Sequence, residues 1–391
     1  MPSPITNSAN ASRFTLDGSP GLESRLAALC EQIREAVLRL IGDGKVEALV
    51  LGGGYGRGHG GVLKTPVGDA PYNDLEFYVF LKGNPVLNET RYRKRLGELG
   101  DSLSPAAGLH VEFKVDSLLR FRKSPVSIFS YDLVSGHRVI QGSDKIFAGC
   151  EHHRDAARIV PTEATRLLLN RCSGLLLVKE LLLKSRLTDE ECDFIGRNLA
   201  KAKLALGDAL LAVEGRYHWD CRHRGRRLAE LSQDRDWPFG RQILAHHGAG
   251  VQFKLHPRQL LKPRVEFAAE HFELTKLALQ VWLWVENRRL RTNFATLEEY
   301  ALSSIKKCSG QSLWRNLLLN LRTFGAGATF DRNTRRYPRE RLFNALPLLL
   351  AQSPAQAVLE IRRHLQRQLN TRAEDWLGLV AAYKRVWRCY G

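Results

Sequence analysis

The sequence has no uncharged apolar run long enough to cross a bilayer. Its most apolar segment, LLLNRCSGLLLVKELLL, is interrupted by Arg171, Lys179 and Glu180, whereas a membrane-spanning helix needs about 18 or more apolar residues in succession. No membrane partner is therefore expected. The first 20 residues, MPSPITNSANASRFTLDGSP, also lack the apolar stretch of a signal peptide, and their polar composition predicts a disordered tail over residues 1–20.

The sequence also lacks the paired cysteine motifs of zinc-binding sites and of redox-active sites. The chain has 7 cysteines and no C-x-x-C pair, which argues against a zinc ribbon or a thioredoxin-like site. Scattered single cysteines are typical of reduced thiols, so we expect a cytoplasmic protein. The glycine-rich stretch after residue 51 lacks the G-K-[ST] ending of a Walker A motif.

The composition is that of a soluble globular protein, with 391 residues, 44% apolar and 26% charged. This length predicts two or three domains. The net charge of +18 is uneven, because the first 150 residues are close to neutral and residues 151–391 carry nearly all of the excess. A basic region of this kind suits a polyanionic partner, such as nucleic acid or a phosphorylated substrate, and equally a solvated surface.

Hydrophobic periodicity predicts a mixed first region. We expect a helix over 21–42, strands at 46–52, 74–81 and 110–118, and a helix over 89–103 between the last two strands. Residues 53–73 are rich in glycine and proline, so the sequence predicts a long loop there, without strand or helix.

From Pro161 onward the pattern is helical. We expect a long helix over 161–187, a second opened by the capping box Thr188-x-x-Glu191, and further helices at 272–291 and 313–324. The basic segments 215–227 and 332–343 are predicted as loops, and the first suits either base stacking or an ordinary surface. The predicted fold class is α+β, with a catalytic domain over 21–150 and a basic all-helical domain over 151–391.

The chemistry-bearing residues begin directly after the first predicted strand. Gly53 and Gly54 lack a Cβ, so their backbone can approach a ligand closely and present amide groups to phosphate oxygens. Arg57 follows at a spacing suited to a phosphate contact. A glycine-rich loop alone is a weak signal, and a flexible turn explains it equally well.

Two carboxylates on the next strand strengthen the case. Asp74 and Glu76 lie at i and i+2, so both project from one face. Neighbouring carboxylates repel each other unless a cation lies between them, and Mg²⁺ binds through one or two carboxylates together with substrate phosphates. A third carboxylate on the following strand is Glu112, with Asp116 as the alternative, because strand register cannot be read from one sequence.

This order of features resembles the nucleotidyltransferase superfamily with its polymerase-β-like palm, which includes aminoglycoside and small bacterial nucleotidyltransferases. The resemblance covers about residues 40–145. It implies that Gly53-Gly54 is the Gly-[Gly/Ser] pair of the family and that Asp74, Glu76 and Glu112 are its catalytic, metal-binding carboxylates. The spacer between Gly54 and Asp74 is longer than in minimal members, which leaves the register open.

The resemblance implies a Mg²⁺-dependent enzyme that moves a nucleoside monophosphate from a nucleoside triphosphate, with ATP favoured, to an acceptor hydroxyl and releases pyrophosphate. Gly53, Gly54 and Arg57 would hold the triphosphate, and Glu112 would bind a second metal or act as general base. The acceptor stays open between a small molecule, a protein and RNA. The alternative is a non-catalytic nucleic-acid-binding protein, or a toxin–antitoxin-type partner, on a nucleotidyltransferase core.

Overall fold

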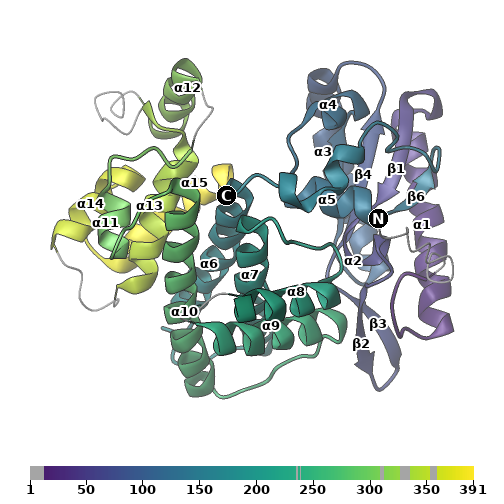
Figure 1. Cartoon of the computed structure of the whole chain (residues 1–391). Coiled ribbons are helices and arrows are strands. Elements are labelled where there is room, and N and C mark those ends of the chain that lie inside the picture. Colours follow the sequence, from purple (N-terminus) through teal and green to yellow (C-terminus); the bar gives the residue numbers. More distant parts are fainter. Residues whose placement is uncertain (1–12, 235–236, 238, 309–311, 326–334, 353–358) are drawn as a thin grey trace. The chain divides into compact units, whose positions relative to one another are not determined.

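The computed structural model describes residues 13–391 except 235–236, 238, 309–311, 326–334 and 353–358 (Figure 1). The chain is α+β, as predicted, and divides into two compact units. The N-terminal unit comprises residues 1–160 together with the short segments 217–223 and 251–258, and the remaining residues form the helical unit. The division therefore falls at Val160 where the sequence predicts 150, and the two later segments that join the first unit have no counterpart in the prediction.

The N-terminal unit contains six strands and the helices that cover them. Its elements are α1 (Pro20–Ile41), η1 (Asp43–Lys45), β1 (Val46–Leu51), α2 (Gly53–Gly56), β2 (Gly61–Thr65), β3 (Gly68–Tyr72), β4 (Leu75–Leu81), α3 (Pro85–Ala107), β5 (Val111–Asp116), α4 (Leu118–Lys123), α5 (Ile128–Ser135), β6 (Arg138–Gln141), η2 (Glu151–Arg154) and η3 (Ala156–Arg158). The three strands and two helices that the sequence predicts here are confirmed.

Four of these strands form one mixed sheet in the order β5-β4-β1-β6. Strand β1 is antiparallel to both β4 and β6, whereas β4 and β5 are parallel. Parallel neighbours need a crossover, and the 23-residue helix α3 provides it. Asn84 begins α3 by accepting hydrogen bonds from the amides of Val86 and Leu87, and Pro85 occupies its first turn.

Apolar side chains cover both faces of the sheet. On one face Leu49, Leu51, Phe77 and Val79 pack with residues of α1 and α3. On the other face Ala48, Val50, Tyr78 and Phe80 pack under α4, α5 and the segment that follows β6. The sheet is thus buried on both sides, which explains why β1 and β4 are almost continuously apolar. Glu76 interrupts the apolar sequence of β4, and it belongs to the second face, together with Tyr78 and Phe80.

The predicted loop over 53–73 is wrong. It contains the short helix α2 and a hairpin of β2 and β3, paired from Gly61↔Tyr72 to Thr65↔Gly68. The buried hydroxyl of Tyr55 holds the base of this hairpin, donating to the carbonyl of Tyr72 at 3.0 Å and accepting from its amide at 2.8 Å. Glycine and proline weaken the strand signal here, but Pro66 and Val67 form a two-residue turn, and Gly68 at φ +118° begins β3 directly after it.

The predicted disordered tail over residues 1–20 is wrong for residues 13–20, while residues 1–12 lie outside the described residues. Phe14 is buried in the core, and Thr15 forms a bridge with Gly60. The carboxylate of Glu23 accepts the amides of Phe14 and Thr15 at 2.7 and 3.1 Å. Strand β6 is a further element that the sequence did not predict; it is short and pairs with β1.

The helical unit is built around α6 and α7, which pack along each other and are covered by α10. Its elements are α6 (Thr162–Leu181), α7 (Asp189–Val213), α8 (Cys221–Asp234), α9 (Gly240–Leu255), α10 (Arg264–Leu290), α11 (Leu297–Leu302), α12 (Leu313–Phe324), α13 (Pro338–Ala351), α14 (Leu359–Leu369) and α15 (Trp376–Tyr390). Helices α8 and α9 each begin or end in a segment assigned to the other unit. No helix in the described ranges is long and apolar enough to span a bilayer.

Helix boundaries in this unit correct three predictions. Helix α6 ends at Leu181 instead of continuing to 187, and the capping box of Thr188 and Glu191 then starts α7 as predicted. The basic segment 215–227 contains the first turns of α8, and 332–343 contains the start of α13 at Pro338, while residues 332–334 lie outside the described residues. Proline is common in the first turn of a helix, so Pro338 marks the start of a helix within a segment that the sequence predicts as a loop.

Candidate functional site

Two of the three predicted carboxylates face each other across neighbouring strands. The parallel register of β4 and β5 pairs Glu76 with Glu112 directly. Both side chains belong to the face that also carries Tyr78 and Lys114, the next residues of the same parity. The two carboxylates are partly exposed, with side-chain accessibilities of 34% and 42%. Among the residue pairs of the β4–β5 register, only Glu76 and Glu112 bring two charges of the same sign together.

The glycine loop lies against the first of these carboxylates. The amide of Gly52, at the end of β1, donates to the carbonyl of Glu76 at 2.9 Å. A Cβ at Gly52 would lie 2.5 Å from the ring of Tyr78, and a Cβ at Gly53 would lie 3.1 Å from Oε1 of Glu76. Gly53 also has φ +61°, a conformation that side chains rarely adopt. Both glycines are therefore required by close approach to the carboxylate strand.

Hydrogen bonds and one cation orient the Glu76 side chain. The buried hydroxyl of Tyr78 donates to Oε2 of Glu76 at 2.7 Å. The ammonium of Lys114 lies 3.6 Å from the same oxygen and 3.2 Å from Oε2 of Glu112. Burial, and then the charge of Glu76, raise the pKa of Tyr78 far above its usual value, so it stays a donor. The carboxylate pair is thus fixed in position and attracts a cation.

The remaining predicted carboxylates lie in different surroundings. Asp74 is exposed and precedes β4 by one residue, after Asn73 at φ +75°. Asp116, the alternative third carboxylate, is opposite Phe80 and accepts from the amide of Ser117 and from Nε of Arg120, both at 2.7 Å. Since Asp116 is already engaged at the start of α4, the register favours Glu112 as the partner of Glu76.

Arg57 does not extend into solvent. Its guanidinium lies 3.4 Å from Oδ2 of Asp132 on α5, and its side chain is 8% exposed. The hydroxyl of Tyr217 donates to the same Asp132 oxygen at 3.3 Å. Arg57 also fills the space beside Gly136, where a Cβ would lie 2.5 Å from its Cγ. In this structure the side chain predicted to bind phosphate therefore holds the loop to α5.

A second acidic residue anchors the far end of the same loop. Asp220 is buried, and its Oδ2 accepts hydrogen bonds from Nε and Nη2 of Arg222 at 3.2 and 2.8 Å. Burial alone would raise the pKa of Asp220, but the bonds from Arg222 bring it down to about 2. His59 stacks on Trp219 with ring centroids 5.8 Å apart, and burial lowers its pKa to about 4. These contacts could not be predicted from the sequence, because residues 217–220 are remote from residues 57–59 in the chain.

The donor chemistry fits a hard divalent cation. Across the described part of the chain, no three His, Cys, Asp or Glu side chains are grouped as a metal site by themselves. Mg²⁺ does not require such a group, because one or two carboxylates and substrate phosphates suffice. The ammonium of Lys114 against both Glu76 and Glu112 demonstrates that the pair accommodates positive charge. Glu76 and Glu112 are therefore suitable ligands, and Asp74 precedes Glu76 by two residues in the chain.

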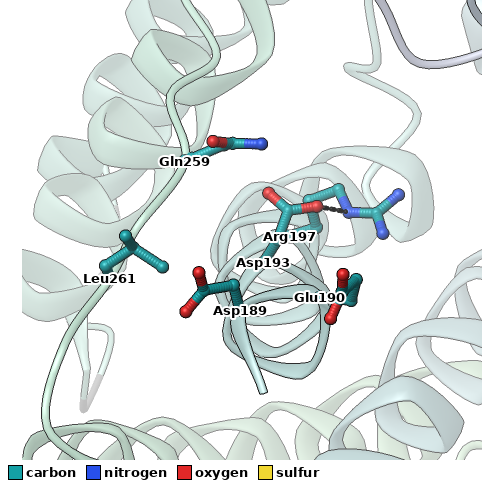
Figure 2. Close-up of a pocket in the computed structure, with 6 residues that line it drawn as sticks. All are labelled: Asp189, Glu190, Asp193, Arg197, Gln259 and Leu261. Carbon is teal, nitrogen blue, oxygen red and sulfur yellow. Dashed lines mark ion pairs between the residues drawn. The ribbon is translucent and has the colours of Figure 1, made fainter.

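A separate pocket of about 230 Å³ lies in the helical unit (Figure 2). It is lined by Asp189, Glu190, Asp193, Arg197, Gln259 and Leu261. The Arg197 guanidinium is paired with Asp193 at 2.8 Å, and the other carboxylates belong to the first turn of α7. Acidic residues in the first turn of a helix interact favourably with the helix dipole and stabilise the helix. None of the predicted site residues lines this pocket.

Part of the positive charge of the helical unit is internal. Arg224, Arg341 and Lys307 are each at most 2% exposed. Arg224 pairs with Asp208, and Arg341 donates to the carbonyl of Gln368 at 3.2 Å. These cations hold helices together and are not available to a polyanionic partner. Among its described residues, however, the helical unit also buries four acidic side chains, those of Glu163, Asp208, Glu286 and Glu340, so burial does not reduce the excess of positive charge on its surface.

Comparison with known proteins found no match for this chain among protein-family models, curated sequences or solved structures.

Proposed function

We propose that the N-terminal unit is a nucleotidyltransferase-type catalytic unit, which moves a nucleoside monophosphate from a nucleoside triphosphate to an acceptor hydroxyl and releases pyrophosphate. The observation that carries this proposal is the in-register pair Glu76 and Glu112 beside Gly52 and Gly53 at the end of β1. A close-approaching glycine backbone next to hard oxygen ligands is an arrangement suited to a metal-bound triphosphate.

Each group has a role in this mechanism. Glu76, Glu112 and Asp74 would hold Mg²⁺, which when bound neutralises charge on the attacking and leaving oxygens. Tyr78 fixes the Glu76 carboxylate through its hydroxyl, so that little reorganisation is needed on binding. Because Gly53 and Gly54 have no Cβ, the loop packs closely against Glu76 and His59, which would place its backbone amides beside the carboxylates. The acceptor stays open between a small molecule, a protein and RNA.

The test is calorimetric titration of ATP, GTP, CTP and UTP into the full chain, with and without Mg²⁺. We expect metal-dependent binding of at least one triphosphate, with ATP favoured, and a loss of about tenfold or more in affinity for Glu76→Gln and Glu112→Gln. Glu98→Gln is the matched control, because Glu98 lies on the exposed side of α3 with a side chain 63% accessible. Binding that is indifferent to Glu76 and Glu112, or no binding by folded protein, would contradict the proposal.

A non-catalytic function on the same core is the second candidate, and one observation favours it. Arg57 is paired with Asp132, so the one arginine of the loop is engaged in a contact within the protein. A binding protein of this kind, or a toxin–antitoxin-type partner, would retain RNA or protein binding with no triphosphate dependence. The same titrations separate the two candidates, with a single-stranded RNA added as a further ligand for the basic helical unit.

A further inference from the structure

An ammonium group lies between the two carboxylates of the candidate site. The Nζ atom of Lys114 is 3.2 Å from Oε2 of Glu112 and 3.6 Å from Oε2 of Glu76. These distances are those of ion pairs with both carboxylates at once. The two oxygens that it contacts belong to residues paired directly in the strand register.

The position of this lysine follows from the backbone. Lys114 is opposite Tyr78 in the β4–β5 register, and it lies two residues after Glu112, on the same face of β5. Its ammonium is also 5.5 Å from the centroid of the Tyr78 ring, a favourable cation–π distance. Strand β5 is at the edge of the sheet, and yet the side chain extends inward along the sheet toward Glu76. The lysine is therefore held over the carboxylate pair.

The ammonium changes the charge of the carboxylate pair. Glu76 and Glu112 bring two negative charges, and Lys114 neutralises one of them. A divalent ion placed between these carboxylates would lie within a few ångströms of the ammonium, where like charges repel each other.

We propose that Lys114 occupies the cation position between Glu76 and Glu112, so that the site binds one divalent ion together with the nucleotide, where the same carboxylates without the lysine would bind two. This inference rests on the proposed nucleotidyltransferase function. It makes the protein's own ammonium the second positive charge of the site, beside the one divalent ion.

The experiment counts metal ions per bound nucleotide by equilibrium dialysis of the full chain. The probes are Mn²⁺ and α,β-methylene-ATP, a non-transferable analogue, with bound manganese measured by elemental analysis and bound nucleotide by absorbance. We expect a ratio of one for wild type and two for Lys114→Met. Lys114→Arg, which keeps the charge, is expected to stay at one. Lys82→Met is the matched control, since Lys82 is at the end of β4 and donates to the carbonyl of Gly44.

The outcomes separate this inference from the function on which it rests. A ratio of two in wild type, or a ratio of one in Lys114→Met, overturns the lysine's role while nucleotide and metal binding still support the transferase. If wild type retains neither manganese nor nucleotide, the proposed function fails and the inference falls with it. Lys114→Gln provides a second neutral variant, and circular dichroism verifies that each variant is folded.

Discussion

Acid should weaken the helical unit through one buried histidine. His271 on α10 is 6% exposed, and its Nε2 lies 2.9 Å from the carbonyl of Leu175 on α6. Since a carbonyl only accepts, Nε2 carries the proton and donates. Burial first, and then the charge of Lys179, lower the pKa of His271 from 6.5 to about 4, against the opposing effect of the Leu175 bond.

The sign and size of the effect follow from that pKa. As pH falls through 6.5 the unfolded chain takes up a proton on His271, while the folded ring stays neutral until about pH 4. Stability is therefore complete above pH 6.5 and is lost progressively toward pH 4. With these two values, the loss attributable to His271 between pH 7.5 and pH 4.5 is about 2–3 kcal/mol.

The assay is urea unfolding of the full chain at pH 7.5 and 4.5, followed by tryptophan fluorescence. Every tryptophan except Trp219 belongs to the helical unit, so the signal reports mainly on that unit. His271→Leu should lose about 2–3 kcal/mol less than wild type between the two pH values. The broken bond to Leu175 weakens the variant at both pH values and cancels in this comparison.

The exposed His110, changed to leucine, is the matched control, because its ring faces water. Its variant should follow the wild-type dependence on pH. If wild type and His271→Leu lost the same stability between pH 7.5 and 4.5, proton uptake at His271 would not be the cause and the reasoning would be refuted.

Two further predictions concern single close contacts. Gly53→Ala should lower the opening free energy of the β4 amides, measured by hydrogen exchange, by about 1–2 kcal/mol. The reason is that Gly53 has φ +61° and that a Cβ there would lie against Glu76. Gly44→Ala is the control and should leave this free energy unchanged, because a Cβ at Gly44 would meet open space. Lys179→Met should destabilise the helical unit by about 2–4 kcal/mol in urea unfolding. The half-buried ammonium of Lys179 donates to the carbonyl of Leu350 at 2.8 Å and to that of Gln352 at the end of α13, and burial lowers its pKa to about 8. The variant loses both hydrogen bonds. Lys276→Met, at an exposed position of α10, is its control, and equal stabilities of the two variants would contradict this role for Lys179.

The sequence was informative where periodicity was strong. The apolar β1 and the alternating β4 and β5 were predicted at nearly their observed bounds, and the parity of Glu76 and Glu112 on their strands was predicted with them. Which carboxylate would be opposite Glu76 could not be predicted, because register depends on how the crossover α3 seats β5 beside β4. The structure favours Glu112 through that register alone.

Contacts between remote segments were beyond the reach of one sequence. Arg57 was predicted as a phosphate ligand from its place in a glycine-rich loop, but Asp132 and Tyr217, far along the chain, determine where its side chain lies. The hairpin of β2 and β3 was missed for another reason. Its stability comes from pairing and from Tyr55 at its base, neither of which appears as local strand propensity in a segment rich in glycine.

The β4–α3–β5 crossover also determines when the site can exist during folding. Glu76 and Glu112 become neighbours only after the 23-residue helix α3 has docked and closed the parallel pair. Long-range parallel pairing forms slowly, because the entropy of loop closure is lost before the contacts form. Two carboxylates that repel each other delay this closure further, and Lys114, carried on the arriving strand, brings the compensating charge with it. Because Lys114 and Glu112 are both on β5, the charge that offsets the repulsion between the two carboxylates arrives with the strand that creates it.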